Sequence, residues 1–131
     1  MLYPTLRLHQ RKEESDFLFH PWIFSGAIAS YSAPVQDGDL VSVVDSKGRP
    51  LGTGHFGGGS IAVRLLSFDP EEAIDRAFYK RRLEAALRLR LSCDLVRPVG
   101  SCERPNTTYR LVHGEGDSLP GLIIDIYDRP A

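Results

Sequence analysis

The sequence predicts a mainly β protein with some α structure: a small β-barrel or sandwich, followed by one long helix and a β-hairpin. Three observations lead to this prediction. Short apolar segments punctuated by glycine recur over residues 1–68, at the spacing of an all-β domain. Apolar residues at helical spacing follow an acidic capping signal near residue 69. Two further β-rich segments flank a turn at 113–121 that contains glycine and proline.

Composition excludes several classes of protein. The 131 residues are enough for one ordinary domain or two small ones. No apolar run approaches the roughly 20 residues of a membrane helix, and no N-terminal signal pattern is present, so we expect a cytoplasmic chain without a membrane partner. Cys93 and Cys102 lack the CxxC spacing and the neighbouring histidines of a metal site, so we expect free thiols and no bound metal.

The first strands are expected at 2–9 and 27–31, with a charged turn at 10–16 between them. Ahead of the second strand, Pro21 favours the start of a short helix and Gly26 its end.

Trp22, Ile23 and Phe24 are three large apolar residues in succession, so at least one must lie at the rim of the core or be exposed. Two interpretations of this stretch stay open. It is either a plug of the core, or a surface turn that offers an aromatic ring and a histidine to a nucleic acid.

A Val-rich strand is expected at 40–44, followed by a hairpin turn at 45–48 in which Gly48 takes a positive φ. The return strand begins at Leu51, and residues 60–68 form the last strand of the series. In that strand Arg64 lies on the face opposite Ile61, Val63 and Leu65.

Residues 52–57 fit the dinucleotide-binding pattern GxGxxG letter for letter. Pyrophosphate binding requires a helix that begins at this loop, yet more glycines and a β-branched strand follow. We therefore predict no nucleotide site here. The glycines are expected to serve a tight turn or a close approach of backbone to a partner.

Residues 69–72 (Asp-Pro-Glu-Glu) predict a helix start with Asp69 as the N-cap, and the helix is expected to run to about Leu91. Its apolar residues form two stripes, one of Ile74, Ala77, Phe78, Ala85 and Leu89, the other of Leu83, Leu87 and Leu91. The remaining surface carries Arg76, Lys80, Arg81, Arg82, Arg88 and Arg90. This face is either simply solvated or binds phosphate groups, since arginine matches phosphate oxygens well.

A loop is expected over 92–106, then strands at 107–112 and 122–127 that form a hairpin around the turn 113–121. Glu115 and Asp117 in that turn could be paired catalytic carboxylates. A polar turn capped by its own acidic side chains explains them as well and is favoured.

Several of these segments resemble the RlmI-type rRNA methyltransferases, which make 5-methylcytosine in large-subunit rRNA. The matching segments are His20–Ile28, Asp39–Val41, Leu51–Gly54, Ser60–Arg64 and, most specifically, Tyr109–Tyr127. The resemblance implies a PUA-like RNA-binding β-barrel over 1–68, then a linking helix and the first hairpin of an incomplete central α/β domain over 69–131. Phe56-Gly-Gly-Gly and Ser118 depart from the family pattern.

The function implied by the resemblance is RNA binding that positions a catalytic domain on rRNA. The residues expected to contact RNA are His20, Trp22, Ser25, Gly26 and Arg64 in the first module and Lys80, Arg81 and Arg88 on the helix. The family's methyltransferase domain, its catalytic cysteine and its S-adenosylmethionine site have no counterpart in this chain. We therefore expect no cofactor here and no methyl transfer by this polypeptide alone.

Two other functions stay open. The chain could be an interdomain scaffold without RNA affinity, in which an exposed hairpin edge mediates homodimerisation. It could also be a standalone enzyme that uses His113, Glu115 and Asp117, which would require these groups to converge with perturbed pKa values.

Overall fold

The computed structural model describes residues 3–10, 20–100 and 102–128. The chain divides into two compact units, 1–74 and 75–131, and each is described by itself. The sequence predicts a boundary between residues 68 and 69, whereas the two compact units meet between residues 74 and 75. Residues 69–74 therefore belong to the first unit. The charged turn predicted at 10–16 falls almost wholly outside the described residues.

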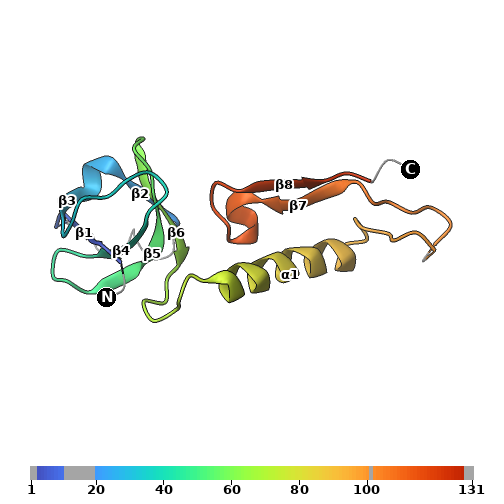
Figure 1. Ribbon diagram of the computed structural model, residues 1–131, viewed down its shortest axis with the longest axis horizontal. Coiled ribbons are helices and arrows are strands. Elements are labelled where there is room, and N and C mark those ends of the chain that lie inside the picture. The colour runs from blue at the N-terminus through green and yellow to red at the C-terminus, as the bar shows by residue number, and fades with distance from the viewer. Residues whose placement is uncertain (1–2, 11–19, 101, 129–131) are drawn as a thin grey trace. The chain divides into compact units, whose positions relative to one another are not determined.

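The first unit is a curled six-stranded sheet (Figure 1). Its strands are β1 (Thr5–Leu8), β2 (Trp22–Phe24), β3 (Ile28–Tyr31), β4 (Leu40–Val44), β5 (Pro50–Phe56) and β6 (Ile61–Ser67). They lie in the order β2-β6-β5-β4-β1-β3, antiparallel except for the parallel pair β1–β4. The 3-10 turn η2 (Ser25–Ala27) connects β2 directly to β3, the strands at the two ends of this order.

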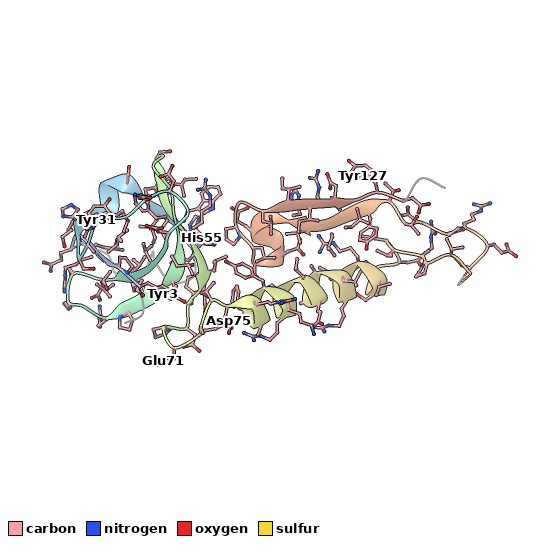
Figure 2. The ribbon with its side chains drawn as sticks, viewed as in Figure 1. Tyr3, Tyr31, His55, Glu71, Asp75 and Tyr127 are labelled. Atoms are coloured by element: carbon pink, nitrogen blue, oxygen red, sulfur yellow. The ribbon has the colours of Figure 1, made fainter. Side chains whose placement is uncertain are left out.

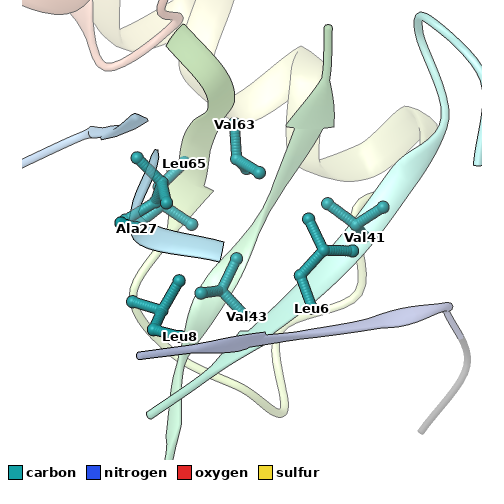
Figure 3. Packing of buried hydrophobic residues seen from close by; sticks show 8 residues of the cluster. Leu6, Leu8, Ala27, Val41, Val43, Val63 and Leu65 are labelled. Carbon is teal, nitrogen blue, oxygen red and sulfur yellow. The ribbon is translucent and has the colours of Figure 1, made fainter. Parts of the chain in front are cut away.

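The core of the first unit is purely aliphatic and lies inside the curl of the sheet. Alternate residues of the central strands point inward and lose nearly all solvent contact, as the period of two requires. The cluster consists of Leu6, Leu8, Ile23, Ala27, Val41, Val43, Val63 and Leu65, seven of which are labelled in Figure 3. The predicted mainly β fold, with Val63 and Leu65 facing inward, is confirmed.

The segment after Pro21 is a strand, not the predicted short helix. Trp22–Phe24 pairs with β6 in antiparallel register, because this pairing buries Ile23 completely, and the helical turn comes only at Ser25–Ala27. Trp22 is half-buried and Phe24 exposed. The prediction that three successive large residues cannot share one core is therefore confirmed.

Gly52 and Gly54 lie inside strand β5, so no helix begins at the GxGxxG segment. A Cβ at Gly52 would lie 2.4 Å from the Ser67 carbonyl oxygen, and one at Gly54 would lie 2.2 Å from that of Arg64. Only glycine lets β5 and β6 approach this closely. The predicted close backbone approach is confirmed, and the partner is β6 of the same sheet.

The second unit consists of helix α1 (Arg76–Ser92) and an antiparallel hairpin, β7 (Tyr109–His113) and β8 (Ile123–Ile126), joined through the 3-10 turn η3 (Gly114–Asp117) (Figure 1). The helix packs against β7 and η3. Among the described residues of the second unit, the large apolar side chains that are fully buried are Phe78, Val112 and Leu119.

The helix starts six residues later than predicted. Asp75 is the N-cap, and its Oδ1 accepts the Phe78 N–H at 2.8 Å. Asp69 instead caps a separate turn by accepting the Glu71 N–H at 2.9 Å, while Ser67 Oγ donates to Glu72 Oε2 at 2.5 Å. Both aspartates are good caps locally. The bond from the end of β6 to Glu72 holds residues 69–72 in the first unit and out of the helix.

The predicted apolar stripes of the helix are wrong in part. The buried helical residues are Phe78, Ala86 and Arg90, separated by eight and four residues, whereas Ala77, Ala85 and Leu89 of the predicted stripe are exposed. Leu91 of the second stripe is also exposed. Arg90, predicted on the solvated basic face, is buried because an acidic partner meets it in the second unit.

Candidate nucleic-acid interface

The pairing of β2 with β6 places Trp22 directly opposite Arg64. Their neighbours Ile23 and Val63 point into the core, so Trp22 and Arg64 share the outer face of the sheet. Directly opposed residues of antiparallel strands have Cβ atoms about 5 Å apart, close enough for their side chains to act together. Trp22 and Arg64 are thus neighbours on this face, and Arg64 Nη1 lies near Gly57, 3.7 Å from where a Cβ would stand.

His20 completes this surface at the entrance to β2. Its Nδ1 accepts the Trp22 backbone N–H at 3.1 Å, and the imidazole meets the indole edge-to-face with ring centroids 5.7 Å apart. Because Nδ1 is an acceptor, the neutral ring carries its proton on Nε2, which can donate to a ligand. We call His20, Trp22 and Arg64 the Trp22 surface.

Ser25 and Gly26 lie beside this surface in η2, and both are exposed. The Ser25 N–H donates to the Ser60 carbonyl at 2.9 Å, so it is not available to a ligand. A Cβ at Gly26 would have no atom within 4 Å, and φ there is not positive. Neither packing nor backbone conformation therefore requires glycine at this position.

Sequence reasoning missed His55, which is labelled in Figure 2 and lies opposite Arg64 on the other side of β6. Its Nδ1 lies 2.9 Å from the Gly38 carbonyl oxygen, and this contact fixes the ring against the 36–39 turn. The signal was available only through strand pairing, because His55 and Arg64 become neighbours when β5 pairs with β6. Arg64 therefore lies between Trp22 and His55 in register across three strands.

The predicted basic residues of the second unit are on the surface of α1. Lys80, Arg81 and Arg88 are all exposed, and Lys80 Nζ lies 3.7 Å from Glu84 Oε1. The guanidiniums of Arg81 and Arg82 lie 6.0 and 5.0 Å from the centre of the Phe78 ring, within cation–π range. The exposed part of α1 thus presents fixed positive charge.

Arg90 is engaged inside the second unit. Its guanidinium makes a bidentate ion pair with Asp117, donates from Nε to the Arg110 carbonyl at 3.1 Å, and contacts the Ala86 carbonyl. The hydrogen bond from Arg90, followed by the one from the His113 backbone N–H, holds the pKa of Asp117 below its ordinary value. Arg90 is therefore a structural cation and not part of a binding surface.

The turn 113–121 is organised by this same aspartate. Asp117 Oδ2 accepts the His113 backbone N–H at 2.6 Å, so the turn is capped by its own carboxylate as favoured from the sequence. Because both carboxylate oxygens of Asp117 already bind Arg90, this residue has no role as a general base. Glu115 and His113 are both exposed.

Within the described ranges, no three His, Cys, Asp or Glu side chains come together as a metal site. No helix of these ranges is long and apolar enough to cross a membrane. Cys93 and Cys102 are free thiols, as predicted.

Comparison with known proteins identifies the first unit. Residues 6–68 match the family model of a PUA-like domain. The chain is 39% identical over 126 residues to Ribosomal RNA large subunit methyltransferase I of Klebsiella pneumoniae, across 95% of this chain and 30% of that protein. It is 38% identical over 121 residues to the protein of the same name from Escherichia coli, covering 92% of this chain and 29% of that one. The chain thus spans about a third of the length of these relatives.

Solved structures share the fold at low sequence identity. One described as a SAM-dependent methyltransferase from Streptococcus mutans superposes with a TM-score of 0.65 at 19% identity, over 94% of this chain and 30% of that one. A methyltransferase solved in complex with SAH gives a TM-score of 0.68 over the same shares. The resemblance predicted from the motifs is confirmed: the chain contains a PUA-like domain and is similar, over nearly all its length, to the N-terminal part of the RlmI-type large-subunit rRNA methyltransferases.

Proposed function

We propose that this chain is the RNA-binding N-terminal region of a SAM-dependent rRNA cytosine methyltransferase and positions the catalytic domain on rRNA. The observation that supports this best is the Trp22 surface, where Trp22 lies opposite Arg64 on the outer face of a PUA-like domain and the His20 imidazole contacts the indole. Proteins bind unpaired nucleotides with aromatic side chains that stack on the bases and cationic side chains that bind the phosphates.

Each residue of the Trp22 surface has a distinct role in this proposal. The half-buried indole of Trp22 stacks on an unpaired base, Arg64 binds the adjacent phosphate, and His20 donates from Nε2 to a base edge or phosphate. Ser25 and Gly26 extend the contact through the Ser25 hydroxyl and the open space beside Gly26. On α1, Lys80, Arg81 and Arg88 hold phosphates of the backbone.

In the relatives, catalysis belongs to the part of the protein that this chain does not cover. The methyl donor, S-adenosylmethionine, is bound outside the residues of this chain, and this polypeptide alone transfers no methyl group. Because the relatives are named for ribosomal RNA, the proposed place of action is the cytoplasm.

A fluorescence-anisotropy titration with a structured rRNA fragment at two salt concentrations tests this proposal, with duplex DNA as the control. We expect salt-sensitive binding that prefers RNA, and a loss for W22A of about 5- to 150-fold, since stacking contributes about 1–3 kcal/mol per base. Tyr127→Ala removes an aromatic of the second unit that is 73% exposed, and is the matched control. No binding of RNA at low salt would refute the proposal.

A specific observation favours the second candidate, a dimerisation scaffold without RNA affinity. The β7–β8 sheet has two strands among the described residues and carries exposed Ile123 and Tyr127. Unpaired strand edges beside apolar side chains favour addition of another strand. Light scattering between micromolar and millimolar protein concentration tests this candidate. A dimer fraction that grows with concentration, in a chain that does not bind RNA, would support the scaffold. A chain that stays monomeric at every concentration would eliminate it.

A further inference from the structure

A row of three hydroxyl side chains crosses the outer face of the first sheet. Ser42 of β4 lies opposite Thr53 of β5, and Thr53 in turn lies opposite Ser67 of β6. Val41 and Val43, which flank Ser42 in the strand, point into the core, so Ser42 and the residues paired with it lie on the opposite face. We call Ser42, Thr53 and Ser67 the hydroxyl row.

The segment 69–73, which follows β6, borders the hydroxyl row and encloses a pocket with it. Ser67 Oγ donates to Glu72 Oε2 at 2.5 Å and so ties this segment to the end of the strand. Thr53 is only 2% exposed, although it lies on the outer face of the sheet. The pocket has a volume of about 400 Å³, within the roughly 300–1,000 Å³ of typical ligand sites. Its lining, which belongs to the first unit, includes Tyr3, Ser42, Pro50, Thr53, Pro70 and Glu71, of which Tyr3 and Glu71 are labelled in Figure 2.

This lining favours a planar ligand that donates hydrogen bonds. Glu71 is exposed at the rim, and its carboxylate can only accept hydrogen bonds. The hydroxyls of the row can donate as well as accept. No described residue of the lining is a lysine or an arginine, so a phosphate group would meet a carboxylate there without a compensating cation. The rings of Tyr3, Pro50 and Pro70 add apolar surface for a flat group.

The position of the pocket on β5 connects it with the Trp22 surface. His55 lies opposite Arg64, and Thr53 precedes His55 by two residues and therefore shares its face of the strand. Two residues of strand span about 7 Å at roughly 3.3 Å per residue. An RNA strand that stacks one base on Trp22 and places a phosphate at Arg64 therefore brings a nearby nucleotide to the pocket.

We propose that this pocket binds an unpaired guanine of the RNA that the Trp22 surface holds, an inference that rests on the proposed function. Proteins read unpaired bases through hydrogen bonds to their Watson–Crick edges. Guanine presents N1–H and its amino group side by side on that edge, which matches the two oxygens of the Glu71 carboxylate. Uracil presents a single N–H between two carbonyl oxygens, and the carboxylate disfavours this edge. The hydroxyls of Ser42 and Thr53 bind the polar atoms of the base that Glu71 does not reach.

The test follows the backbone amides of the full chain by NMR during titration with guanosine or uridine. Both nucleosides lack phosphate, so their binding does not report on phosphate contacts of Arg64 or of α1. We expect guanosine to shift the amides of Ser42, Gly52 and Thr53, with a dissociation constant at least about fivefold below that of uridine, the lower limit for one bidentate contact. W22A should keep these shifts, because the indole is not part of the pocket lining.

E71Q should remove the preference for guanosine, because the amide keeps the size of the side chain but loses the charge and one acceptor. T53V replaces the buried hydroxyl by a methyl group of similar size and should weaken guanosine binding by a smaller factor. Glu103→Gln removes an exposed carboxylate of the second unit, is the matched control and should leave the preference unchanged. Amide shifts outside the pocket show that each variant is folded.

The outcomes separate this inference from the proposed function. Equal affinities for guanosine and uridine, or a preference that survives in E71Q, would overturn the guanine pocket while RNA binding measured by anisotropy stands. Shifts at Thr53 with L-argininamide but not with guanosine would assign the pocket to a basic segment of a protein, and would overturn the inference equally. If the wild-type chain binds no RNA at low salt, the proposed function fails, and this inference fails with it.

Discussion

The two units of this chain are stabilised by different kinds of interaction. The first unit buries a purely aliphatic cluster, and its most buried side chains include Leu6, Val41, Val43 and Val63. The second buries fewer apolar side chains and places the Arg90–Asp117 ion pair between its helix and its hairpin. Aliphatic burial tolerates changes of pH, whereas a buried pair depends on both charges. We therefore expect the stability of the first unit to depend little on pH and that of the second unit to depend on it more.

The largest expected effect comes from breaking the buried pair. D117A leaves the Arg90 guanidinium buried without its counterion, which should cost about 3–5 kcal/mol of stability. Hydrogen exchange should show lost protection at Val112 and Leu119 while Val41 and Val43 stay protected. The double variant R90M/D117L should restore most of the loss, because an apolar pair of similar volume needs no counterion.

D125A is the matched control for this experiment. It removes a carboxylate that pairs with Arg110 at 2.7 Å near the surface of the same hairpin. Solvent screens exposed pairs and they contribute little, so protection at Val112 should change little. Equal losses for D117A and D125A would show that burial of the Arg90–Asp117 pair does not distinguish the two carboxylates.

A cavity in the first unit should have the next largest effect. Leu6 is fully buried among the valines of β4 and β6, so L6A should cost about 2–5 kcal/mol through lost burial and an unfilled cavity. Exchange should accelerate at Val41 and Val43 and remain unchanged in β7 and η3. A simultaneous loss of protection in both units would contradict an effect confined to the first unit.

The smallest expected effect is a pH dependence confined to the second unit. Arg90, and then the His113 N–H, lower the pKa of Asp117 below its ordinary value of 3.8, so the unfolded chain takes up a proton more readily than the folded one. The pair's contribution is complete above about pH 4 and is lost as pH falls through the lowered pKa. Asp125, whose pKa Arg110 lowers, adds a weaker dependence of the same sign.

Denaturant titrations between pH 6 and 2.5, followed at β7 amides by exchange, measure this dependence. R90M/D117L should flatten the curve relative to the wild-type chain. A curve of unchanged steepness in the double variant would assign the acid sensitivity to other carboxylates of the chain.

Much of the first unit could be predicted from the sequence, because its strands follow local rules. The valines of β4, the turn at Gly48 and the inward face of β6 all come from a period of two and from glycine's access to positive φ. Trp22 and Arg64 were both identified from the sequence as candidates, but their adjacency requires the pairing of β2 with β6.

Only the tertiary structure decided which of two good caps starts the helix and which helical residues are buried. Asp69 carries the stronger local signal, but Asp75 is the N-cap, and the contact of Ser67 with Glu72 assigns Asp69 to a turn of the first unit. The sequence predicts Arg90 as a surface cation, but its ion pair with Asp117, 27 residues later, buries it. Arg7 likewise reaches the Ser46 carbonyl only through the parallel pair β1–β4. Local rules describe what a residue prefers, whereas the burial of a charge or a cap depends on partners distant in sequence.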